Sequence, residues 1–198
     1  MAIAGLATCA FGQGIVLDNL GNSAASSSAT SGGLLWEKVG ASTALFDGYN
    51  YNIGATVMAG SSAGSLSLIG TYYPGNNGGN PFTGADVGKF QLGAAGAPVS
   101  ISGVAPGGAV FLQIQFWDYS SPNATGTFTS YAAALAGLDP TAVVSFSNGS
   151  GGPGTSPPST PVELTGMPAV ILSSVPEPAT MALAGLGIAS LLAFRRRS

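Results

Sequence analysis

Residues 110–119 read VFLQIQFWDY and are the best candidate for a central β-strand in this chain. Successive side chains of a strand point to opposite faces of its sheet, so one face carries Val110 and every second residue after it, while the other face begins with Phe111. Both faces are largely apolar or amphipathic, which is typical of a strand that has neighbours on both sides. Residues 105–108, APGG, are predicted to form the turn that leads into it.

The rest of the chain has the same turn-rich pattern. Short apolar runs are interrupted by Gly, Pro, Asn and Ser, and no long period of 3.6 residues appears. The number and spacing of these runs predict a mostly β fold, a single antiparallel β-sandwich of jelly-roll-like form. The other predicted strands are 15–20, 34–39, 52–59, 65–72, 99–104, 142–147 and 170–172.

One short helix is expected to cover this sandwich. Residues 132–138 are good helix formers that follow a Thr or Ser cap, and the run stops at Asp139-Pro140. Two loops rich in Gly, Asn, Pro and Ser are predicted at 76–81 and 149–161. No internal repeat is evident.

The composition excludes several kinds of chemistry. Only 13 of the 198 residues are charged, about 7% where an ordinary soluble domain has roughly a quarter. There is no histidine, and the single cysteine, Cys9, lies where a signal peptide would remove it. Catalytic triads that use His or Cys and ordinary zinc sites therefore lack their ligands, and we expect neither a metal nor a cofactor.

The body of the chain is acidic. Residues 13–174 contain seven carboxylates and two lysines, a net charge of −5. Phosphate backbones repel such a surface, so nucleic acid is not an expected partner. Calcium stays open as an alternative because Asp18-Asn19 and residues 47–50, DGYN, offer oxygen ligands, although no EF-hand loop is present.

The N-terminus has features of an export signal. Residues 1–11 are apolar or small, and Ala10-Phe11-Gly12 resembles a signal-peptidase site. Residues 1–12 are therefore predicted to be a signal-peptide remnant without its positively charged region, followed by an exported domain at 13–174. A lipoprotein box that ends at Cys9 is the alternative, weakened by the threonine that precedes the cysteine.

The C-terminus has the features of a membrane stop. Residues 179–194 carry no charge and end directly on Arg195, Arg196 and Arg197. As a helix they would reach about 24 Å, short of the ~30 Å hydrocarbon thickness that flanking residues can help to span. We expect a transmembrane helix here, with a buried core helix as the alternative.

A short proline motif stands immediately before this apolar run. Val175-Pro176-Glu177-Pro178, the apolar run and the arginines together resemble the PEP-CTERM sorting signal of Gram-negative bacteria, over residues 175–198. The resemblance implies that an exosortase, a membrane processing enzyme, recognises Pro176, Glu177 and Pro178 and cleaves near them. Both prolines lack a backbone N–H and keep the motif extended. The alternative is a stiff linker before a permanent anchor.

The same kind of tail is also catalogued as an ice-binding protein C-terminal domain. Ice-binding faces present ranks of regularly spaced threonines, and the T-x-T pattern of this body is confined to one short run, Thr125, Thr127 and Thr129. We therefore expect no ice-binding array in the body.

These features predict an exported, non-catalytic component of the cell envelope or the exopolysaccharide matrix, with an inner-membrane-anchored precursor. The alternative is a carbohydrate-binding module or a glycan-active enzyme, for which we nominate Trp117, Asp118 and Tyr119 as glycan contacts. A glycosidase needs two acids roughly 5–10 Å apart, and none of the acids stands in a recognisable motif. A core position for Trp117 would argue against this alternative.

Overall fold

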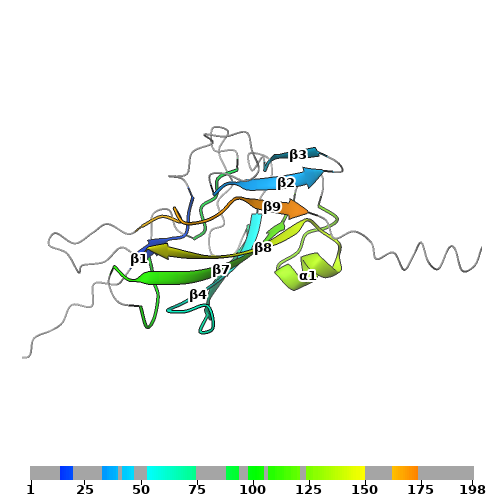
Figure 1. The fold of residues 1–198 in the computed structure, drawn as a ribbon. Coiled ribbons are helices and arrows are strands. Elements are labelled where there is room, and N and C mark those ends of the chain that lie inside the picture. Colours follow the sequence, from blue (N-terminus) through cyan, green and yellow to red (C-terminus); the bar gives the residue numbers. More distant parts are fainter. Residues whose placement is uncertain are drawn as a thin grey trace, which may run out of the picture.

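The described part of the chain is mostly β-structure with one short helix, as predicted (Figure 1). The computed structural model describes residues 14–19, 33–39, 42–46, 53–74, 88–93, 98–104, 107–120, 124–149 and 162–173. The strands are β1 (Gly14–Val16), β2 (Leu35–Val39), β3 (Ser42–Leu45), β4 (Ile53–Gly60), β5 (Ser67–Tyr72), β6 (Pro98–Ser100), β7 (Ala109–Asp118), β8 (Thr141–Gly149) and β9 (Val170–Ser173), and the helix is α1 (Tyr131–Ala136).

Each predicted strand has a counterpart, and β3 is a strand that the sequence pattern missed. Its residues Ser42, Thr43 and Ala44 are exposed, so it carries no apolar signal. The predicted signal remnant at 1–12, the loop at 76–81, residues 150–161 of the second loop and the C-terminal helix lie outside the described residues. Within the described ranges, no helix has the length and apolar character needed to span a bilayer.

Seven strands form one mixed sheet in the order β3-β2-β9-β8-β7-β4-β5, and β1 and β6 form a separate antiparallel pair. The neighbours in the large sheet are antiparallel except β2 and β9, which run parallel. The prediction of a purely antiparallel arrangement is therefore wrong for this pair. Most of the chain separates β2 from β9, and that length permits the crossover that a parallel pair requires.

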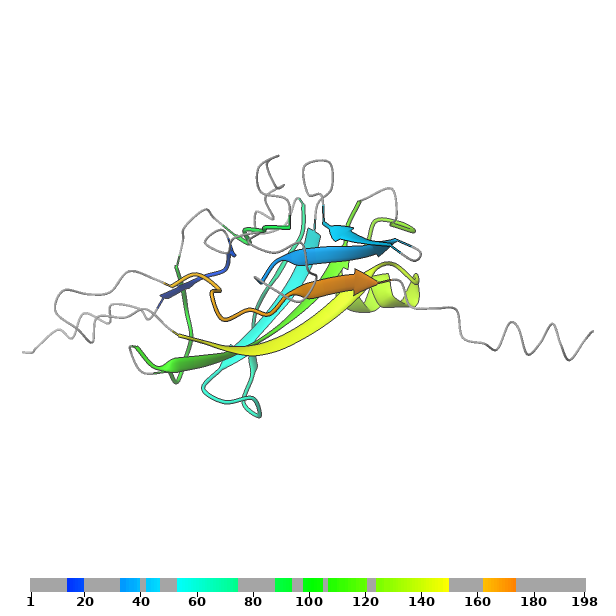
Figure 2. The ribbon, with the colours of Figure 1, turned by 45° about the horizontal axis from the view of Figure 1, so that its top comes forward.

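The large sheet consists of two blocks that meet at one point. β7 and β8 are paired along their length, from Ala109↔Gly149 to Trp117↔Thr141, whereas β8 and β9 share the single register pair Thr141↔Ser173. The block β3-β2-β9 thus diverges from the block β8-β7-β4-β5. Figure 2 shows β2 and β9 turning away from the long, curved strands β7 and β8.

The hydrophobic core lies against the inward face of β7. Val110, Leu112, Ile114 and Phe116 alternate along this strand, and each is at most 1% exposed. They pack in one cluster with apolar side chains of the other strands and of the connecting segments. That cluster includes Ile15, Leu17, Leu35, Phe46, Ala55, Val57, Phe90, Val144, Leu164 and Leu172.

A buried asparagine joins three segments that are distant in sequence. The Asn19 side-chain amide donates to the carbonyl oxygens of Gly33 (2.8 Å) and Gly88 (3.2 Å), and its Oδ1 accepts from the Phe90 backbone N–H (2.6 Å). Buried polar groups are costly unless they are hydrogen-bonded, and here both ends of the amide are used. Asn19 therefore fixes the irregular segments that cover the core beside β2.

Asn148 has the same role near the end of β8. Its amide donates to the Glu163 carbonyl oxygen (3.1 Å), and its Oδ1 accepts from the Gly166 backbone N–H (2.8 Å). These bonds hold residues 163–166, the segment that leads into β9, against β8. The chain is thereby directed toward its parallel pairing with β2.

Helix α1 packs on the large sheet near the end of β7. The Ser130 hydroxyl oxygen accepts from the Ala133 backbone N–H at 3.3 Å and caps the helix start, as predicted. The helix ends at Gly137, and its residue Ala134 is fully buried. A helix of six residues gains little stability by itself, so its packing on the sheet stabilises it.

Candidate functional site

Trp117, the first of the nominated glycan contacts, is fully buried. Its Nε1 donates to the Phe128 carbonyl oxygen at 2.8 Å. The indole lies over Gly54, its register partner on β4, because a Cβ placed there would be 1.9 Å from Trp117 Cε2. The nomination of Trp117 as a stacking platform is therefore wrong, because no face of the ring is open to a sugar. The indole packs against β4 at this end of the sheet.

Asp118 is also fully buried. Its Oδ1 accepts from the Ser120 backbone N–H at 3.2 Å, in a local turn at the end of β7. Tyr119 keeps some exposed surface and stacks on Tyr73, with ring centroids 5.8 Å apart and planes 14° from parallel. Of the three nominated residues, Tyr119 alone reaches the surface, so the glycan site predicted at this strand end is not assembled.

A second carboxyl, Asp139, joins Asp118 at the same end of the sheet. Asp118 N–H donates to the Pro140 carbonyl oxygen (2.9 Å), which brings the two residues onto neighbouring segments. Asp139 is fully buried, and its Oδ1 accepts from the Thr125 backbone N–H (2.6 Å). Sequence reasoning treated Asp139 as the end of the helix and gave it no further role.

The environment of Asp139 favours its neutral form. Burial raises the pKa of Asp139 from 3.8 to about 6; the backbone hydrogen bond from Thr125 lowers the pKa, and the neighbouring charge of Asp118 raises it. A raised carboxyl pKa beside a second acid is a feature of acid–base sites. Here both carboxyl groups are buried, so the pair lies in the protein interior.

The raised pKa makes a prediction about stability. Because the folded-state pKa of Asp139 lies above its ordinary value of 3.8, the native state binds the proton more tightly than the unfolded chain does. The stability that this protonation contributes is fully present below the unfolded-state pKa and is lost as pH rises through about 6. The test is urea unfolding across this pH range, in buffer with a chelator. Asp139→Asn should reduce the pH-dependent change in the free energy of unfolding by about 1–3 kcal/mol. Identical pH profiles for the variant and the parent protein would contradict the prediction.

The contact between Trp117 and Gly54 makes a second prediction. Gly54→Ala places a methyl group inside the indole ring volume and should destabilise the fold by about 1–3 kcal/mol. Gly64→Ala is the matched control, because nothing lies within 4 Å of a Cβ there. Thermal unfolding followed by circular dichroism compares the two. Equal melting temperatures for both variants would show that the strand end is not tightly packed.

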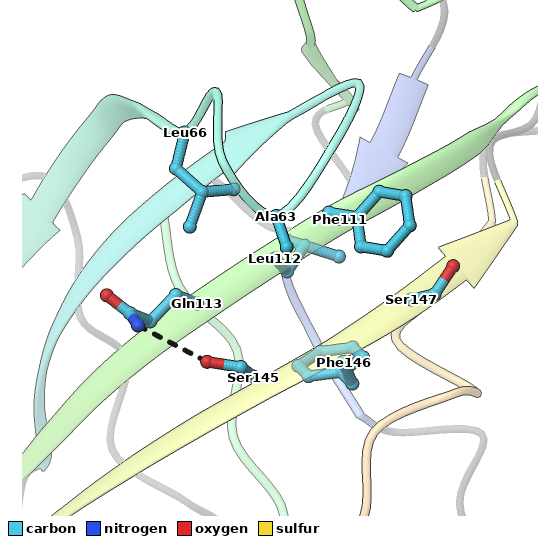
Figure 3. Close-up of a pocket in the computed structure, with 8 residues that line it drawn as sticks. All are labelled: Ala63, Leu66, Phe111, Leu112, Gln113, Ser145, Phe146 and Ser147. Atoms are coloured by element: carbon cyan, nitrogen blue, oxygen red, sulfur yellow. Dashed lines mark hydrogen bonds between the residues drawn. The ribbon is translucent and has the colours of Figure 1, made fainter.

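A hollow lies toward the other end of β7, where the hairpin between β4 and β5 curls over β7 and β8 (Figure 3). Its volume is about 260 Å³. The lining residues carry no charge; they are Ala63, Leu66, Phe111, Leu112, Gln113, Ser145, Phe146 and Ser147. We call this hollow the β7–β8 groove.

The groove combines an aromatic ring with neutral hydrogen-bonding groups. Gln113 Nε2 donates to the Ser145 hydroxyl oxygen at 3.3 Å across the two strands. Phe111 and Ser147 are a cross-strand pair two residues further along the same strands. Because both pairs lie on the face of the sheet opposite the core, their side chains line the floor of the groove. The sequence pattern marked these positions only as the second face of a central strand.

The calcium alternative considered from sequence involves Asp18-Asn19 and residues 47–50. Both ends of the Asn19 amide are used in backbone hydrogen bonds, and Asp18 Oδ2 accepts from Gln91 Nε2 at 3.4 Å. Residues 47–50 lie outside the described part of the chain. Among the residues that the structure describes, no group of three or more His, Cys, Asp or Glu side chains could hold a metal ion.

Comparison with protein families supplies the functional context. The family model of the PEP-CTERM protein-sorting motif matches residues 174–197. The chain carries a PEP-CTERM sorting motif. Searches of curated proteins and of solved structures found no match to this chain.

The PEP-CTERM motif confirms the resemblance drawn from the sequence. It implies export, sorting at a membrane and processing by an exosortase. The match includes the predicted recognition residues Val175, Pro176, Glu177 and Pro178 and the predicted stop at Arg195–Arg197. These positions lie outside the described residues, so their individual roles stay predictions.

Proposed function

We propose that this PEP-CTERM protein is a non-catalytic component of the cell envelope or the exopolysaccharide matrix. The single observation that carries the proposal is the sorting motif at residues 174–197. The precursor is held in the inner membrane by residues 179–194, and an exosortase cleaves near the Pro-Glu-Pro motif. The body, a mostly β domain with few charges and no histidine, is the delivered cargo.

The physical chemistry of the tail supports this division of roles. Pro176 and Pro178 each remove a backbone donor and restrict φ, so the motif stays outside any following helix beyond its first turn. An extended peptide at the membrane surface is accessible to a processing enzyme. The arginines then hold the cytoplasmic end of the apolar segment in place.

Replacement of the motif tests the sorting step. With Pro176→Ala, Glu177→Ala and Pro178→Ala together, the protein should accumulate as an uncleaved precursor in the membrane fraction, as seen by immunoblot. Pro157→Ala with Pro158→Ala is the control, since it removes two prolines from the loop at 149–161 and should leave processing intact. Normal processing of the triple variant would contradict the proposal.

The β7–β8 groove favours carbohydrate binding as a second candidate function. Sugars present apolar ring faces and hydroxyl groups, which an aromatic side chain and neutral amide or hydroxyl groups can bind together. Phe111 supplies the apolar surface, and Gln113 with Ser145 supplies hydrogen bonds. The volume of about 260 Å³ lies below the roughly 300–1,000 Å³ of sites for drug-sized ligands, which suits a single sugar unit of a polysaccharide. This location differs from the strand end nominated from sequence.

Substitutions in the groove test the carbohydrate proposal. Phe111→Ala and Gln113→Ala should each lower the affinity for purified exopolysaccharide by about tenfold, equivalent to about 1.4 kcal/mol, in affinity electrophoresis. Val143→Ala is the control, since Val143 is exposed on β8 outside the groove lining. Circular dichroism checks that the variants are folded. Unchanged mobility shifts for both groove variants would contradict the proposal.

A further inference from the structure

Two acidic side chains are buried together at the end of β7 opposite the β7–β8 groove. Asp118 ends β7, and Asp139 lies in the short segment between α1 and β8; both are fully buried. The hydrogen bond from Asp118 N–H to the Pro140 carbonyl oxygen fixes the two segments side by side. Among the described residues, the charged group whose field acts on the Asp139 carboxyl is Asp118.

Among the described residues, one carboxylate oxygen of Asp139 has no hydrogen-bond partner. Asp139 Oδ1 accepts from the Thr125 backbone N–H at 2.6 Å and from the Thr125 hydroxyl at 3.4 Å. Asp139 Oδ2 is buried and accepts no hydrogen bond. A buried, unsatisfied carboxylate oxygen beside a second carboxylate is costly, and a cation or a proton is needed to offset that cost.

We propose that Asp118 and Asp139 bind a divalent cation, and that this cation is Ca²⁺. Carboxylate oxygens are hard donors that suit Ca²⁺, which accepts further carbonyl and water ligands in a flexible geometry. Mg²⁺ demands a stricter octahedral arrangement and releases water reluctantly. Neither His nor Cys is available for zinc in the described residues. Export, implied by the sorting motif, takes the domain to a compartment where calcium sites of weak to moderate affinity are common.

The local structure explains how such a site would act. Thr125 holds the Asp139 carboxyl through Oδ1, so Oδ2 is left in a defined position. The cation would join the end of β7 to the segment that connects α1 and β8. It would therefore fasten α1 and residues 124–130 over Trp117. Only two carboxylates contribute, so we expect a dissociation constant of about 10⁻⁴–10⁻³ M, as in extracellular modules.

Calcium titration of the full-length chain, purified in mild detergent and treated with EDTA, tests the site. Isothermal titration should give one Ca²⁺ per chain, and a calcium concentration about tenfold above the dissociation constant should raise the melting temperature by about 3–5 °C. MgCl₂ should produce at most a third of this shift. No calcium-dependent shift in the parent protein would overturn the proposal and leave a shared proton as the partner of Asp139.

Two variants locate the bound ion. Asp139→Asn keeps an oxygen for the Thr125 hydrogen bond but removes the charge, so it should fold and bind Ca²⁺ at least tenfold more weakly. Glu163→Gln removes one carboxylate near the opposite end of β8, where the Glu163 carbonyl oxygen accepts from Asn148, and should keep the full shift. An equal calcium response in Asp139→Asn and the parent protein would also overturn the proposal. These calcium measurements do not depend on whether the β7–β8 groove binds a glycan.

Discussion

The inward face of β7 is the surface against which the rest of the protein packs. Its alternating side chains Val110, Leu112, Ile114 and Phe116 are buried and belong to the same cluster as residues of both sheet blocks and of the β1–β6 pair. Burial of a large apolar side chain contributes about 1.5–3 kcal/mol, so this row supplies a major share of the folding free energy. Among the described residues, Thr141↔Ser173 is the single register pair between the two blocks. Packing across the core, rather than continuous strand pairing, therefore holds them together.

The opposite face of β7 divides into two environments. Near one end, Phe111 and Gln113 line the uncharged β7–β8 groove. At the other end, Trp117 is fully buried, and its Nε1 donates to the Phe128 carbonyl oxygen. This face of β7 thus carries an uncharged groove near one end and a buried indole at the other.

Sorting and recognition depend on different levels of structure in this protein. The PEP-CTERM motif at residues 174–197 is contiguous in sequence, and an enzyme can bind it as an extended peptide. The groove requires β4, β7 and β8 to be in register. The Asp118–Asp139 pair requires the end of β7 to lie beside the segment after α1. A chain that fails to fold would therefore keep its sorting signal and lose both candidate sites.

Short-range patterns in the sequence determined the sorting motif, the mostly β class, the central position of β7 and the capped helix. These features depend on the order of neighbouring residues, through proline geometry, alternation of period two and the Ser130 cap. Tertiary structure alone decided the parallel pairing of β2 with β9, the burial of Trp117 and the meeting of Asp118 with Asp139. Each of these depends on contacts between residues distant in sequence. An alternating strand shows which residues share a face, but the chain segments that later cover that face determine whether an indole contacts a sugar or the protein interior.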